Sequence, residues 1–431
     1  EPESSSAKIT ITFISGTNVY LDPLNTNDPD EDGSLLHPFD SWEDITWVEG
    51  NNYLQKCGTT IRADYIVIGA NYTSIGSYGN GAKPVIESQT TGFVIRGFEK
   101  SNISINNLSI KGIQSSSLIY FLGNSCDNII IENCIFESSL NAIQIMDGLN
   151  FTIRYNTISV ENDAINTAAR SNDIYYNIFK RNSVAVRVMG NASNANIYNN
   201  VFYDNSEAVS ATYAELTLYN NIFYLADQSQ FAIRHHTDKI ISDHNIFYPE
   251  KEGFIEINSN KYDNLEQLMQ QLRIDLHSFN SDPGFIDIYS DNFDIGYRSP
   301  AINSGISVNL NKDHFGRSVP SWGLPDIGAS EYSGIVPPSF AKEKESSMIL
   351  FPNPTSDHVN IVIQVPYSLI SEKSEVRIMD LHGKDLLTKI ITADYSTIQE
   401  QLDLSNMSNG IYLVVFQIAD IIVSEKLIII R

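Results

Sequence analysis

Short runs rich in Ile, Val, Phe and Tyr, separated by turns of Asn, Ser, Asp and Gly, fill the middle of the chain. Such runs are typical of short β-strands between tight turns. One triplet, Asn followed by any residue and then Ile or Phe, recurs at steps of 23, 21, 23, 21 and 24 residues. Its copies begin at Asn133, Asn156, Asn177, Asn200, Asn221 and Asn245.

A second pattern, Ala followed by Ile or Val, keeps nearly the same step. It occurs at Ala142, Ala164, Ala185, Ala208 and Ala232. A constant step of this size indicates a repeat architecture, and the leucine framework of leucine-rich repeats is missing. Three short strands and three turns per step predict one coil of a parallel β-helix, whose strands stack about 4.8 Å apart. We expect the recurrent asparagines to stack as an amide ladder with a structural role.

The segments that flank the repeats differ in pattern. Residues Ile9 to Glu87 are expected to form a cap and the first coils, because an open solenoid end must be covered. After Phe247 the period is lost, and Tyr262 to Leu276 has helical spacing.

The last part of the chain has the alternation of antiparallel strands around turns at Gly383 and Gly410. A stretch rich in Pro, Ser and charged residues, Ser333 to Ser347, precedes it and is typical of a linker. The predicted domains are therefore a β-helix with its cap over 1–332, a linker over 333–347 and a β-sandwich over 348–431. The predicted fold class is all-β.

Charge and composition exclude several functions. The formal net charge of -24 repels nucleic acid and anionic membranes, and we expect neither as a partner. The most apolar stretch, Ile411 to Ile430, is interrupted by charges, so no membrane span is expected. The three cysteines are too scattered for a disulfide framework, and no nucleotide-binding or zinc-protease motif occurs.

The strings YLDP, DEDGSLLHPFDSW and IGSYGNGAKPVIES, the NNIFY coils, and the closing SDPGFID, SPAINSG, DHFGRSV and PDIGASEY resemble the bacterial pectate-lyase-like superfamily. The closing strings resemble its choice-of-anchor subgroup. This resemblance covers roughly residues 9 to 332 and implies a right-handed parallel β-helix. It does not select a reaction, because the superfamily holds polysaccharide lyases, glycoside hydrolases and proteins without assigned activity.

A second resemblance begins at Leu350, where FPNPTSDHVNIVI, VRIMDLHGK, LDLSNMSNGIYLVVF and EKLIIIR are similar to the type A sorting domain of the type IX secretion system of Bacteroidetes. The resemblance implies an Ig-like antiparallel β-sandwich, the secretion machinery as a partner, and a secreted or cell-surface location. In that family the domain is commonly cleaved after export.

The Ala-Ile/Val strand of each coil is where we expect chemistry. Period-two alternation buries the Ile or Val and turns the next residue outward. The predicted outward column is Tyr120, Gln144, Asn166, Arg187, Ser210 and Arg234. His236 is the next outward position on its strand, and a register shift of one residue would place His235 there instead.

A polysaccharide lyase acting on an acidic, uronate-containing polymer is the leading hypothesis. Arg187 would neutralise the substrate carboxylate, His236 or His235 would remove the neighbouring proton, and Tyr120 or Arg234 would assist. Substrate-binding positions would be Gln144, Asn166, Ser210 and His235.

Two alternatives remain open. A glycoside hydrolase would use Asp163 and Glu207, equivalent positions two coils and so about 9.6 Å apart, near the upper end of the range for inverting enzymes. A non-catalytic glycan-binding or adhesion protein would need neither set. In each case the expected partner is an extracellular polysaccharide, and we expect a monomer.

A calcium loop is also a candidate. Asp28, Asp30 and Asp32, followed by Gly33, have the alternate-oxygen spacing of such loops, although Phe39 stands where the twelfth-position acid would be. Ca²⁺ is the only cofactor that the sequence suggests.

Overall fold

The computed structural model describes residues 16–63, 65–88, 90–112, 116–137, 139–227, 229–297, 299–321, 323–334, 347–364, 373–380, 382–392, 397–419 and 421–431. The chain divides near Ser333 into two compact units, and four residues of the 270–273 segment group with the second. Most of the predicted linker lies outside the described residues. Among the helices of the described ranges, none has the length and apolarity to cross a membrane.

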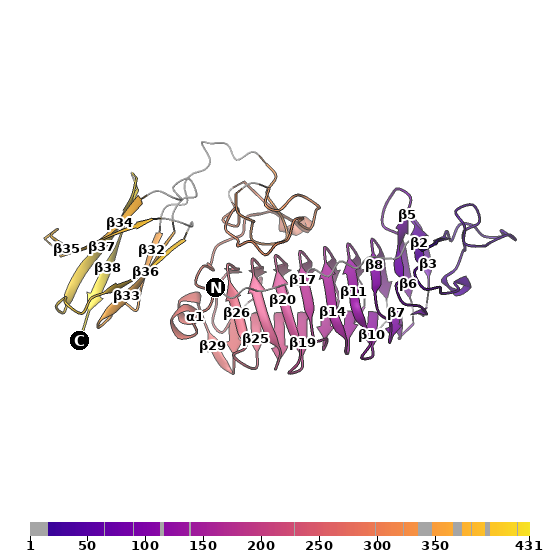
Figure 1. The fold of residues 1–431 in the computed structure, drawn as a ribbon, viewed down its shortest axis with the longest axis horizontal. Coiled ribbons are helices and arrows are strands. Elements are labelled where there is room, and N and C mark those ends of the chain that lie inside the picture. Colours follow the sequence, from indigo (N-terminus) through magenta and orange to yellow (C-terminus); the bar gives the residue numbers. More distant parts are fainter. Residues whose placement is uncertain are drawn as a thin grey trace. The chain divides into compact units, whose positions relative to one another are not determined.

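The first unit is a parallel β-helix built from three sheets, here called A, B and C (Figure 1). Sheet A contains β1 (Asn18–Leu21), β2 (Asn52–Lys56), β5 (Ser74–Tyr78), β8 (Ile103–Asn106), β11 (Asp127–Glu132), β14 (Leu149–Arg154), β17 (Asn172–Tyr175), β20 (Asn194–Tyr198), β23 (Glu215–Tyr219) and β26 (Ile240–Asp243). Sheet B contains β3 (Thr60–Arg62), β6 (Val85–Ser88), β9 (Ser109–Gly112), β12 (Ile135–Glu137), β15 (Thr157–Ser159), β18 (Ile178–Lys180), β21 (Val201–Tyr203), β24 (Ile222–Tyr224) and β27 (Ile246–Tyr248). Sheet C contains β4 (Ile66–Ile68), β7 (Phe93–Phe98), β10 (Ser117–Leu122), β13 (Asn141–Ile145), β16 (Asp163–Thr167), β19 (Val184–Met189), β22 (Glu207–Thr212), β25 (Phe231–His235), β28 (Ile255–Ile257) and β29 (Asn260–Tyr262). The all-β prediction and the β-helix are confirmed.

Each strand of a coil pairs in register with its equivalents in the neighbouring coils. In sheet C, Ile143 pairs with Ile165, which pairs with Val186, and all three side chains are fully buried. In sheet B, Phe179, Phe202, Phe223 and Phe247 stack inside the helix with ring centroids 4.8 to 5.0 Å apart. Stacked apolar columns of this kind supply the core that a single coil could not bury.

The asparagine ladder forms at the turn between sheets A and B. Oδ1 of Asn177 accepts the backbone N–H of Asn156 at 3.0 Å, and the same bond links Asn177 to Asn200 and continues to Asn245. The Nδ2 groups donate to carbonyls of earlier residues, so the buried amides are satisfied. The ladder has the structural role expected for it.

The first predicted member of the ladder is wrong by one residue. Cys134 occupies the ladder position, because its N–H donates to Oδ1 of Asn156 at 2.8 Å. Asn133 is exposed, has a positive φ of 52°, and donates to Asn107 in a separate outer pair. The Asn-x-Ile triplet at Asn133 is therefore shifted by one residue from the structural repeat.

The ends of the β-helix are covered by irregular segments. The N-terminal region contains the 3₁₀ turn η1 (Trp42–Asp44) and an aromatic group in which Trp47 packs between Trp42 and Tyr53. At the other end lies α1 (Leu265–Gln271), which is shorter than the predicted helix. Arg273 and Asp275 have positive φ values and end the helical path, and the buried Asp275 carboxylate instead accepts hydrogen bonds from the last rung of the ladder.

The segment after α1 covers the outer face of sheet B. It contains β30 (Phe285–Asp287), η2 (Ile288–Ser290) and β31 (Asn292–Ile295). Phe293, Ile295 and Ile327 form one buried cluster with Val201 and Ile222 of the sheet. This face of the solenoid is therefore used for packing.

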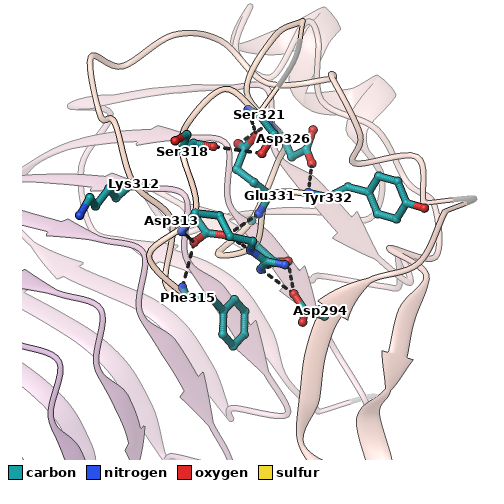
Figure 2. Close-up of polar contacts among 12 residues, drawn as sticks. Asp294, Lys312, Asp313, Phe315, Ser318, Ser321, Asp326, Glu331 and Tyr332 are labelled. Atoms are coloured by element: carbon teal, nitrogen blue, oxygen red, sulfur yellow. Dashed lines mark hydrogen bonds and ion pairs between the residues drawn. The ribbon is translucent and has the colours of Figure 1, made fainter. Parts of the chain in front are cut away.

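The DHFGRSV and PDIGASEY strings form a polar network inside this covering segment (Figure 2). The fully buried Asp313 side chain accepts hydrogen bonds from Nε of Arg317 at 2.7 Å and from the backbone N–H of Glu331 at 2.8 Å. Glu331 in turn accepts the N–H of Asp326 at 2.9 Å, and Arg317 reaches Asp294 at 2.6 Å. These motif residues thus hold the covering segment together.

The second unit is an antiparallel β-sandwich. One sheet contains β32 (Ser347–Phe351), β33 (His358–Gln364) and β36 (Thr397–Asp403), and the other contains β34 (Lys373–Met379), β35 (Asp385–Thr392), β37 (Gly410–Ile418) and β38 (Ile421–Ile429). Val359 and Ile361 from the first sheet and Val376, Val414 and Phe416 from the second share one core. The unit therefore has its own hydrophobic core, as the predicted sandwich requires.

Candidate functional site

The outer face of sheet C carries the predicted outward column (the C-column). The register pairs Tyr120 with Gln144, Gln144 with Asn166, Asn166 with Arg187, Arg187 with Ser210, and Ser210 with Arg234. Figure 1 shows strands β10, β19 and β25 of this sheet along the row of coils. The structure therefore brings these side chains into one line across successive coils.

Arg187 is not a free cation. Its Nε and one terminal nitrogen contact the two carboxylate oxygens of Asp163 on the preceding coil at 2.8 and 3.1 Å. The hydrogen bond to Asp163 raises the pKa of Arg187 further. Asn166 donates to the same carboxylate at 3.0 Å. The side chain that the lyase hypothesis needs for a substrate carboxylate already binds a carboxylate of the protein.

Arg234 is paired in the same way. It donates to Glu207 on the preceding coil and lies 3.7 Å from Glu256 on the following one. Its guanidinium also stacks over the ring of Phe231 at 4.0 Å from the centroid. Arg187 and Arg234 are therefore each neutralised by acids one coil away.

The two carboxylates of the hydrolase alternative are the partners of these arginines. Asp163 and Glu207 occupy equivalent positions, since both pair with Val184 in the register. Asp163 binds Arg187 and Glu207 binds Arg234. The arginines of the lyase hypothesis and the carboxylates of the hydrolase hypothesis are therefore partners in two ion pairs.

His235, the last residue of β25, and His236, which follows it, take opposite sides of the sheet. His235 is buried, and its ring nitrogens contact the carbonyls of Thr237 and Ala214. His236 is exposed, and its Nδ1 lies 3.0 Å from the carbonyl of Ala211. Burial lowers the pKa of His235. The alternative register is wrong, because His235 cannot reach a ligand on the outer face.

The other members of the C-column are held by neighbouring coils. Tyr120 stacks on Phe93, with ring centroids 4.1 Å apart and an angle of 14° between the planes. Oε1 of Gln144 accepts a hydrogen bond from Ser117 at 2.7 Å. Ser210 is 4% exposed, so it offers little surface to a ligand.

A line of apolar side chains runs beside the C-column, at the next outward position of each strand, which is also the position of His236. Leu122 pairs with Phe98 one coil earlier, and Met146 and Met189 hold the corresponding position in later coils. Phe98 is 46% exposed and Met146 is 40% exposed. The sequence contains this line, because each of these residues follows the outward C-column position of its strand by two residues. The face combines a polar line with an exposed apolar line.

A shallow hollow of about 340 Å³ lies at the end of this face. Its walls are Ser229, Gln230, Phe231, Glu252, Gly253 and Lys261. Phe231 is shared with the Arg234 stack, and the ammonium of Lys261 lies 5.9 Å from the same ring. The hollow therefore adjoins the C-column and combines an aromatic ring with charged and amide groups.

The aspartates of the predicted calcium loop are engaged in local contacts. Asp28 contacts Nδ1 of His37 at 2.9 Å and accepts the N–H of Asp30 at 3.0 Å, and Asp32 accepts the N–H of Ser34 at 2.8 Å. The histidine contact lowers the pKa of Asp28. The acidic group that does converge within the described part of this region is Glu31, Asp40 and Asp44. The side chains of Asp28, Asp30 and Asp32 therefore do not form one converging group of ligand atoms.

Comparison with protein families gives two matches. Residues 85–262 match the right handed beta helix region, and residues 349–430 match the secretion system C-terminal sorting domain. The chain is a secreted β-helix protein with a type IX sorting domain. Both resemblances of the sequence analysis are confirmed at this level, and the β-helix match is consistent with the pectate-lyase-like assignment.

The sorting domain marks the protein for export by the type IX secretion system to the cell surface or the extracellular space, and it implies contact with that machinery. The predicted location is therefore confirmed. No curated protein has a sequence that matches this chain.

Proposed function

We propose that this secreted β-helix protein binds a neutral extracellular polysaccharide lengthwise along the outer face of sheet C. The observation that carries the proposal is the pairing of Arg187 and Arg234 with carboxylates of adjacent coils. Neither guanidinium can bind a uronate without giving up a carboxylate of the protein. A net charge of -24 on the chain also disfavours a polyanionic ligand.

The chemistry of the face suits a sugar chain. Sugar rings present apolar C–H surfaces and hydroxyl groups, and the face offers the apolar line of Phe98, Leu122, Met146 and Met189 beside the C-column. Coils about 4.8 Å apart repeat this arrangement along the solenoid, which suits a polymer better than a small molecule. The hollow at Phe231 would hold one end of the bound segment.

A lyase is the second candidate, and His236 favours it. Its Nδ1 lies 3.0 Å from the carbonyl of Ala211, so an N–H there leaves Nε2 as the basic nitrogen of an exposed ring. In this mechanism Arg187 would have to exchange Asp163 for the substrate carboxylate. That exchange costs the protein an existing bidentate contact, which is why binding without cleavage is preferred.

A panel of neutral and uronate-containing polysaccharides tests both candidates. We expect retention of the purified protein on a neutral polymer in affinity electrophoresis, without new reducing ends and without a rise in absorbance near 235 nm. A rise in that absorbance on an acidic polymer would establish the lyase. New reducing ends without it would establish a hydrolase, and their loss in Asp163→Asn and Glu207→Gln would assign it to these two carboxylates. Failure to bind any neutral polymer would overturn the proposal.

A further inference from the structure

Two histidines and an aspartate meet at the C-terminal end of the β-helix. Asp243 is the last residue of β26, His244 follows it, and His277 lies in the segment after α1. Each residue offers one potential ligand atom, and these three atoms all lie within 4.8 Å of one another. All three side chains are 20 to 25% exposed, so the group is sheltered but open to solvent ions.

The backbone fixes the orientation of the carboxylate. Oδ1 of Asp243 accepts the N–H of His244 at 2.9 Å and the N–H of His277 at 2.6 Å. Oδ2 is thereby turned to the two imidazoles, with Nδ1 of His277 at 2.5 Å and Nδ1 of His244 at 3.5 Å. A ligand oxygen held by hydrogen bonds to its other half is the arrangement that orients carboxylates at metal sites.

One nitrogen of the group lacks a hydrogen-bond partner. Nδ1 of His244 is buried and makes no hydrogen bond, although it faces the carboxylate. The rings of His244 and His277 stack with centroids 4.6 Å apart, which places both Nδ1 atoms beside Oδ2. A buried imidazole nitrogen that faces a carboxylate without a hydrogen bond is available to coordinate a cation.

The spacing is close to that of a metal site. Bonds of about 2.0 Å from a tetrahedral ion to nitrogen and oxygen place neighbouring ligand atoms about 3.3 Å apart. The contact from Oδ2 to Nδ1 of His244, at 3.5 Å, is close to this length, and the contact to Nδ1 of His277, at 2.5 Å, would lengthen by less than about 1 Å. Two imidazoles and one carboxylate are ligands that suit Zn²⁺ and similar divalent ions better than Ca²⁺ or Mg²⁺.

We propose that Asp243, His244 and His277 bind a divalent transition-metal ion of the zinc class, which fastens the segment after α1 to the last coil. That segment already docks on the coil, because the N–H of Asp275 donates to Ser242 and the N–H of Phe279 donates to Asn245. The ion would add a cross-link between β26 and the segment that contains His277, beside the last rung of the ladder. This site is separate from the outer face of sheet C.

The register supplies a matched variant for the test. Asn199 and Asn220 hold the position of His244 in the two preceding coils, and all three residues have positive φ values between 52° and 57°. Asparagine tolerates this conformation. His244→Asn therefore keeps the turn and removes only the imidazole, and His236→Ala removes an exposed histidine elsewhere as the control.

The experiment titrates ZnCl₂ into chelator-treated full-length protein by calorimetry and records the melting temperature with and without the ion. We expect about one Zn²⁺ per chain and a higher melting temperature when Zn²⁺ is bound. His244→Asn and His277→Gln should weaken binding at least about tenfold and abolish the thermal shift, while His236→Ala leaves both unchanged.

Co²⁺ in place of Zn²⁺ gives a second readout, because its visible absorption reports coordination by nitrogen and oxygen ligands. Absence of Zn²⁺ binding to the wild-type protein would overturn the proposal. So would binding that stays equally tight in both folded histidine variants, since the ion would then lie elsewhere.

Discussion

At the residue scale, the ion pairs of sheet C separate what a sequence can predict from what it cannot. Strand alternation placed Arg187 on the outer face correctly. The partner, Asp163, lies 24 residues earlier and meets Arg187 only because one coil stacks on the next. Side-chain contacts between coils depend on rotamers and exact strand register. The orientation of the column was therefore predictable, and its charge was not.

A pH dependence is expected from Asp326 in the network of the covering segment. Burial, followed by the nearby charge of Glu331, raises the pKa of Asp326 to about 7. An unfolded chain has a value of about 3.9 for this group. Between these values the folded state keeps a proton that the unfolded state has lost, so this group's contribution to stability falls as pH rises from about 4 to 7 and then levels off.

Comparison of wild type with Asp326→Asn isolates this contribution. The variant loses an acceptor for the N–H of Asn303 or Tyr332 and should be destabilised at every pH. The destabilisation should be larger at pH 5 than at pH 8, by about 1 to 3 kcal/mol, because only the wild type loses stability between them. Chemical denaturation at both pH values measures it, with Asp238→Asn, an exposed acid, as the control. An equal cost at both pH values would contradict this account.

At the element scale, the repeat predicted the coil but misplaced one rung. The triplet at Asn133 fits the pattern, yet Cys134 takes the ladder position and Phe136 pairs with Ile158 in sheet B. Aligning the copies on the buried Phe or Ile rather than on Asn would have found the frame. The buried position has a strict size and polarity requirement, whereas Asn also suits the positive φ of the preceding turn residue.

Asn200 and Asn133 therefore make a matched pair. Asn200→Ala removes an acceptor for Asn177 and leaves buried carbonyls of Ile174 and Tyr198 without their donor, which should cost about 2 to 3 kcal/mol. Asn133→Gly removes an exposed side chain, keeps the positive φ of 52° without strain, and should cost less than about 1 kcal/mol. Urea denaturation of both variants checks the difference. Similar costs would mean that the ladder contributes little beyond its packing.

At the scale of the whole molecule, the two units have different tasks. Each contains its own core, and the sorting domain was predictable because its strings are specific. We expect deletion of Phe351 to Arg431 to leave the melting temperature of the β-helix within a few degrees and to abolish export in the native host. Thermal unfolding and assay of the culture medium test both parts. Unfolding of the truncated β-helix, or its continued secretion, would contradict this division.

The proposed function depends on the outer face of sheet C, and two exposed side chains test that proposal most directly. The measurement is the affinity of purified protein for the neutral polysaccharide that retains it, for wild type, for Phe98→Ala with Met146→Ala, and for Ile241→Ala on sheet A as an equally exposed control. We predict that the sheet C variant binds at least about tenfold more weakly, a loss of about 1.4 kcal/mol or more, while Ile241→Ala binds like wild type. Undiminished binding by the folded sheet C variant would contradict the account.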